Sequence, residues 1–126
     1  MTNENFERLK DIKIENFIWV IYIGIILLSW YSNYFEKNYI LYKDEKAREK
    51  YQELLILIFS ILVVIYAYFT YSSYLDLVNI NEYDSKKKKD LTYASFIGSL
   101  LILISGIIFL IIAIMDDNID VELAFN

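Results

Sequence analysis

The feature that most constrains this chain is a run of twenty-five residues, 91–115, that contains no charged side chain. As a helix with a rise of about 1.5 Å per residue, the run is about 37 Å long, whereas the hydrocarbon core of a bilayer is about 30 Å thick. A segment of this length crosses a membrane with some tilt. The run therefore predicts a transmembrane helix.

Two earlier runs, 17–35 and 54–75, are also free of charged residues, and each has about the length that a span requires. We therefore expect an all-α integral membrane protein with three transmembrane helices in a small bundle, forming a single domain over 1–126. The segments outside the spans are expected to be two charged connections and an acidic tail: 36–53, 76–90 and 116–126.

The N-terminal segment, 1–16, mixes charges with Phe6, Leu9 and Ile12 at three-residue spacing. Two interpretations remain open: an amphipathic turn or two lying at the membrane interface, or a solvated helical extension of the first span. Trp19 lies near one end of that span and Trp30 near the other, and such aromatic rings are typical anchors at the headgroup level.

The first connection carries five basic and five acidic residues. Within it, the sequence predicts a charged helix over 44–53 that continues into the second span. Asp44 is a candidate N-cap, and it precedes Arg48 by four residues, which is a favourable spacing for an ion pair on a helix surface. Such mixed charges are usually a solvated face and only seldom a cation site.

The C-terminal half of the second span is rich in tyrosine and ends at an acid. Tyr68, Tyr71 and Tyr74 would present hydroxyl groups near one membrane surface, and Asp76 follows directly. An interfacial aromatic belt explains this pattern. The alternative is a patch for a partner helix or a small ligand, with Asp76 as its charged end.

Small residues recur in the third span at spacings that place them on one side of a helix. Because lipid is as apolar as leucine, close approach of backbones along small residues is a main route by which spans associate. We therefore expect a helix-packing face formed by Ala94, Gly98, Ser105 and Gly106.

Four consecutive lysines, Lys86, Lys87, Lys88 and Lys89, precede the third span and give an orientation signal. They also suit contact with anionic lipid, without forming a specific site. Three basic residues before the first span lie on the same side as these four, and five lie on the other side with the tail, which has none. We expect the N-terminus in the cytoplasm and the C-terminus outside, in a bacterial cell membrane.

The composition disfavours several function classes. The chain has no Cys and no His, so thiolate chemistry, the usual general base and the commonest metal ligands are missing, and we expect no enzyme activity, cofactor or metal. A net charge of −5 argues against a nucleic-acid partner. Alternating-access transport is disfavoured because the spans contain no ionisable group and no Pro.

Two function classes remain. The first is a small interaction or accessory subunit with a partner, regulatory or immunity role, acting through helix packing with a protein partner or a second copy. The second rests on architecture: in size and three-span layout the chain resembles small three-span phage holins, which implies a homo-oligomeric pore. Those holins are expected to end in a basic cytoplasmic tail, whereas this tail contains four acids and no lysine.

Overall fold

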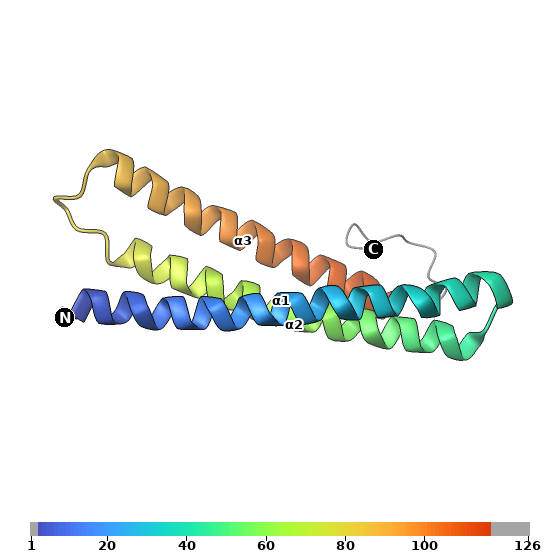
Figure 1. Ribbon diagram of the computed structural model, residues 1–126. Helices are drawn as coiled ribbons and strands as arrows, with labels where there is room; N and C mark the ends of the chain where they lie inside the picture. Colours follow the sequence, from blue (N-terminus) through green and yellow to red (C-terminus); the bar gives the residue numbers. More distant parts are fainter. Residues whose placement is uncertain (1–2, 117–126) are drawn as a thin grey trace. The chain divides into compact units, whose positions relative to one another are not determined.

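The computed structural model describes residues 3–116, and this part of the chain is almost entirely helical, with no strand between those limits. Its helices are α1 (Asn3–Tyr42), α2 (Glu45–Val78) and α3 (Lys86–Met115) (Figure 1). Each is long and apolar enough to cross a membrane, and each contains one of the predicted spans. The expected all-α fold with three spans is confirmed. The acidic tail, apart from Asp116, lies outside the described residues.

The helices extend beyond the predicted spans. α1 is continuous from Asn3, so the N-terminal segment is a helical extension of the first span, on which Phe6 and Leu9 are exposed. Most of the predicted connection 36–53 is helical as well, because α1 ends at Tyr42 and α2 begins at Glu45. Only two residues separate these helices.

The turn between α1 and α2 is built by Lys43 and Asp44. Lys43 has a φ of 51°, in the left-handed region, and its N–H donates to Tyr39 O at 2.8 Å, which closes the end of α1. Asp44 Oδ1 accepts from Lys46 N at 3.0 Å and from Ala47 N at 3.4 Å, which confirms the predicted N-cap.

The ion pair found for Arg48 differs from the one predicted with Asp44. Arg48 Nε donates to Glu45 Oε2 at 2.8 Å, and this hydrogen bond raises the pKa of Arg48. The carboxylate of Asp44 instead accepts from the backbone N–H groups of Lys46 and Ala47 in the first turn.

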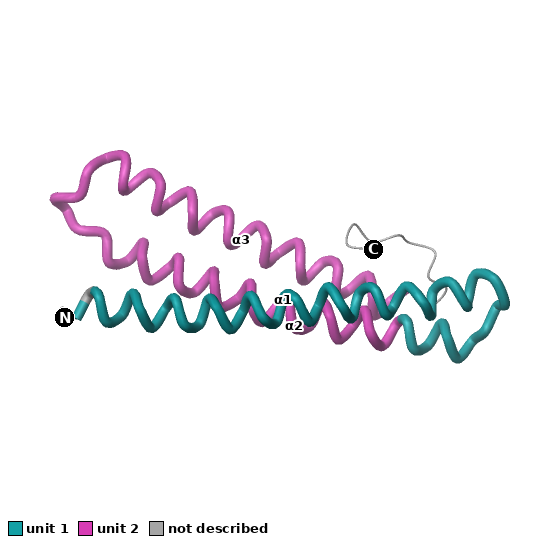
Figure 2. The backbone as a smooth tube through the Cα atoms, in the orientation of Figure 1, with its two compact units in different colours: residues 1–51 teal, residues 52–126 magenta. Residues whose placement is uncertain are grey.

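The chain divides into two compact units, 1–51 and 52–126 (Figure 2). The first contains α1 and the opening turns of α2, and the second contains the rest of α2 with α3. In α1 the buried residues Ile18, Ile25 and Ser32 recur every seven positions. Ser32 is satisfied within its own helix, since its hydroxyl donates to Ser29 O at 2.7 Å.

The second unit is an antiparallel hairpin of α2 and α3. The rings of Phe59 and Phe109 lie 5.8 Å apart, and those of Tyr74 and Phe96 lie 6.0 Å apart nearer the loop. These pairs fix the register of the two helices. The ribbons of α2 and α3 diverge toward the loop that joins them (Figure 1).

The C-terminal end of α3 is held by a side chain from α2. Gln52 Nε2 lies 3.1 Å from Ala113 O and 3.2 Å from Ile114 O. Carbonyl groups in the last turn of a helix have no partner within the helix, and unmet backbone groups are costly in an apolar medium. Gln52 therefore ties the two helices together at this end.

Candidate functional site

A cluster of hydroxyl groups joins α2 and α3 on the loop side of their contact. The hydroxyl oxygens of Ser73 and Ser99 lie 3.0 Å apart. Thr70 Oγ1 lies 2.8 Å from Tyr66 O and 3.1 Å from Ser99 O, so its single proton can serve either carbonyl. Ser73 and Thr70 are buried, and the cluster is therefore an internal hydrogen-bonded contact between two spans.

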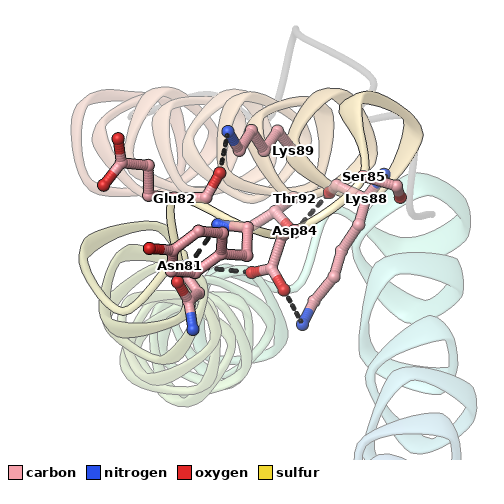
Figure 3. A network of polar contacts seen from close by, with 8 residues as sticks. Asn81, Glu82, Asp84, Ser85, Lys88, Lys89 and Thr92 are labelled. Carbon is pink, nitrogen blue, oxygen red and sulfur yellow. Dashed lines mark hydrogen bonds and ion pairs between the residues drawn. The ribbon is translucent and has the colours of Figure 1, made fainter.

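The loop between α2 and α3 folds around Asp84 (Figure 3). Asn81 N donates to Asp84 Oδ2 at 2.9 Å, and Lys88 Nζ lies 3.2 Å from Asp84 Oδ1. Ser85 caps α3, because its hydroxyl accepts from Lys88 N at 3.1 Å. The carboxylate of Asp84 thus fixes the loop to the first turn of α3.

The same contacts lower the pKa of Asp84. The largest cause is the hydrogen bond from the backbone of Asn81, followed by the side-chain hydrogen bond and charge of Lys88; partial desolvation opposes both. The contacts with Asn81 and Lys88 favour the carboxylate over the neutral acid. The loop is therefore held in this form by an ionised Asp84.

The four lysines are not equivalent. Lys88 pairs with Asp84, and Lys89 Nζ donates to Glu82 O at 3.1 Å, so both side chains turn back to the loop (Figure 3). The side chains of Lys86 and Lys87 form no hydrogen bond or ion pair with any residue of 3–116. Two of the four ammonium groups therefore remain available for a ligand or for lipid.

A cavity of about 420 Å³ lies between the end of α2 and the start of α3. It is open to the surface, and it is lined by polar residue types and one leucine from both helices and from the end of the loop: Ser73, Asp76, Ser85, Lys87, Lys88, Leu91, Thr92 and Ser95. Leu91 is the first residue of the charge-free run, so the cavity lies where the third span begins. A smaller cavity of about 200 Å³, farther along the same hairpin, is lined mainly by apolar residues that include Phe59 and Phe109.

The predicted tyrosine patch is divided in the structure. Tyr71 and Tyr74 are exposed and Tyr68 is half-buried, whereas Asp76 lines the larger cavity, which no tyrosine lines. The acid is therefore grouped with lysines and hydroxyl groups rather than with the tyrosines. A role of the tyrosines in binding a partner or ligand stays a prediction.

The predicted packing residues of α3 also fall into two sets. Gly106 is buried, and a Cβ atom built on it would lie 3.0 Å from Tyr66 Cδ2 and 3.4 Å from Val63 Cγ2. Ala94 and Ser105 are exposed, and a Cβ atom on Gly98 would meet nothing within 4 Å. Gly106 packs on α2, and the packing role of the other three stays a prediction.

Sequence reasoning missed the hydroxyl cluster and most of the cavity lining. Thr70 and Ser73 are three residues apart, which is a usable sign of a shared helix face. Nothing in the sequence pairs them with Ser99, because that pairing depends on the register set by the loop.

Among residues 3–116 no group of three or more acidic side chains is placed to hold a metal ion. The model of a protein family described as TMEM128 protein matches residues 8–114, which is most of the chain and covers nearly all of the three apolar helices. No curated protein and no solved structure matches the chain.

Proposed function

This chain belongs to the TMEM128 protein family, and we propose that it acts as a small interaction or accessory subunit within the membrane. The role is partner binding, regulatory or immunity-like, without catalysis. We propose that a transmembrane helix of a protein partner binds the exposed side of α3 that carries small residues. A second copy of the chain is the other occupant that the experiment below distinguishes.

The observation that carries this proposal is the free side of α3. Ala94, Gly98 and Ser105 share that side, and Ser105 lies at its border with the α2 contact, where it is exposed and lines the smaller cavity beside Gly106. In a bilayer, packing against leucine side chains stabilises helix association little, because lipid is equally apolar. Small residues instead allow two helix backbones to approach closely and form van der Waals contacts. An uncovered side of small residues therefore supports association with another span.

We also propose that the N-terminus and the lysine-rich loop face the cytoplasm, in line with the expected excess of basic residues on that side. A cysteine introduced at Ser85 should then resist an impermeant thiol reagent applied to intact cells. Labelling of Ser85→Cys from outside would reverse this orientation. The bacterial cell membrane stays a prediction of the sequence.

The natural absence of cysteine allows a direct test of the association surface. Single cysteines at Ala94, Gly98 and Ser105 would be coupled to a photoreactive benzophenone in native membranes. We expect discrete cross-linked protein bands from these positions and none from the control Ile104→Cys, which lies on another exposed side of α3. A band at twice the mass of the chain identifies a second copy. Cross-links to lipid alone, at every position, would refute the proposal.

The pore alternative predicts a different result in purified form. If the protein has the interaction role, full-length protein in dye-loaded liposomes should cause no leakage above that of lipid alone. The reason is that a path through these spans would have an apolar middle that resists wetting. Dose-dependent release of a small dye, abolished by Gly98→Leu, would replace the interaction role with a holin-like pore.

A further inference from the structure

The cavity between α2 and α3 has opposite charges on its two walls. Asp76 comes from the last turn of α2 and Lys87 from the first turn of α3. Within residues 3–116 neither the carboxylate of Asp76 nor the ammonium of Lys87 has a hydrogen-bond or ion-pair partner. One anion and one cation thus line the same cavity without being paired to other groups.

Three other polar residues of the lining already have partners in the protein. Lys88 is neutralised by Asp84, Ser85 caps α3, and Thr92 Oγ1 donates to Lys88 O at 2.8 Å. A hydroxyl oxygen that donates one bond retains lone pairs, so Thr92 can still accept from a ligand. Ser95 is exposed on the same wall and can donate or accept.

The position of the cavity indicates what can reach it. Leu91 lines it at the start of the charge-free run of α3, at the level where hydrocarbon gives way to lipid headgroups. Its volume of about 420 Å³ lies in the range of about 300–1,000 Å³ that is usual for ligand sites. A headgroup can therefore enter it while its acyl chains remain in the bilayer.

We propose that this cavity binds the headgroup of an ethanolamine phospholipid, with the phosphate held by Lys87 and the primary ammonium held by Asp76. A primary ammonium has three N–H donors, and the carboxylate of Asp76 and the hydroxyl oxygen of Thr92 can accept hydrogen bonds from them. The phosphate is a strong acceptor for Lys87. This inference is independent of the partner-binding role of α3.

The unpaired acid selects against other headgroups. A choline headgroup carries the same charges but has no N–H donor, so the carboxylate of Asp76 gains no hydrogen bond. A glycerol headgroup carries a negative charge without an ammonium, so Asp76 is left unpaired and repels it. Preference for ethanolamine over choline is therefore the property that separates this site from general attraction of lysines to phosphate.

The proposal can be tested by titrating purified full-length protein in dodecyl maltoside with dihexanoyl phospholipids that carry ethanolamine, choline or glycerol headgroups. Isothermal calorimetry would give the dissociation constants. We expect ethanolamine to bind about tenfold or more tightly than choline, which is the effect of one hydrogen bond between charged groups. Equal binding of the ethanolamine and choline lipids would overturn the proposal.

Two substitutions test which wall of the cavity binds the ammonium and which binds the phosphate. Asp76→Asn should abolish the preference for ethanolamine over choline. Lys87→Gln should raise the dissociation constants of both lipids by about tenfold. Lys86→Gln is the matched control, because Lys86 is a neighbouring lysine that does not line the cavity, and it should bind as wild type. Circular dichroism would confirm that each variant is folded. Unchanged ethanolamine binding by both cavity variants would also overturn the proposal.

The source of the headgroup is tested with soluble glycerophosphoethanolamine. We expect it to bind more weakly than the dihexanoyl lipid, because it cannot place acyl chains beside the spans. Equal affinity would assign the cavity to a free phosphoethanolamine compound, with the same contacts to Lys87 and Asp76.

Discussion

Two sides of α3 have the same kinds of small residue but different surroundings. On one side, Ser99, Gly106 and Ala113 recur every seven residues, and each contacts α2 or is buried. On the other, Gly98 and Ser105 face no close neighbour or are exposed. The difference teaches that a small residue in a span is a packing site only where another helix supplies a matching side chain, such as Tyr66 or Ser73.

The largest expected effect contrasts the two glycines. Gly106→Leu should lower the free energy of unfolding by about 1–3 kcal/mol, because even a Cβ atom there lies 3.0 Å from Tyr66 Cδ2. Gly98→Leu should be neutral or slightly stabilising, because the site is open and Gly is a weak helix former. Unfolding by sodium dodecyl sulfate in mixed micelles, followed by circular dichroism, measures both. Equal destabilisation would show that both sides of α3 are packed within one chain.

A smaller effect is expected from the hydroxyl contact of the packed side. A double-mutant cycle with Ser73→Ala and Ser99→Ala should give a coupling energy of about 0.6 kcal/mol, as is typical of hydrogen bonds between spans. The matched cycle replaces Ser99→Ala by Ser105→Ala and should give no coupling, since Ser105 is exposed. If the two cycles gave the same value, the hydrogen bond between Ser73 and Ser99 would make no specific contribution.

The smallest expected effect is the pH dependence of stability that comes from Asp84, which holds the start of α3 and therefore affects both of its sides alike. Because the pKa of Asp84 is lowered in the folded chain, its stabilising effect is complete above the unfolded value of about 3.9 and is lost as the pH falls through the folded value. The melting temperature of wild type should therefore fall more steeply than that of Asp84→Asn below about pH 4. Parallel curves from pH 6 to pH 2.5 would contradict the role of the Asp84 carboxylate in the loop.

The sequence was sufficient to predict the helices, because charge-free runs of span length and a capping acid are local signals. The three runs lie within α1, α2 and α3, and Asp44 caps α2 as expected. The ion pair found for Arg48 is with Glu45, one residue closer than a spacing rule alone would choose, because the carboxylate of Asp44 accepts from the backbone of the first turn.

The side of α3 that packs on α2 could not be predicted. Its two sets of small residues have similar spacing, and the choice between them depends on the loop and on the side chains of α2. Asp76 illustrates the same limit: it is close to Tyr74 in the chain, but at about 100° per residue it projects about 160° away around the helix. A neighbour in sequence was therefore a poor guide to the neighbours in space.

The connection between α1 and α2 has a practical consequence. Since only Lys43 and Asp44 are outside helices there, the charged segment beyond the spans is two helix ends joined by a tight corner. An epitope inserted at this corner would disrupt the N-cap of α2 formed by Asp44 and the left-handed backbone conformation of Lys43. Exposed loop backbone, in contrast, generally accepts insertions and protease cleavage. A tag intended to report this side of the membrane is therefore better placed as a short substitution on the exposed surface of a helix than as an insertion between the two helices.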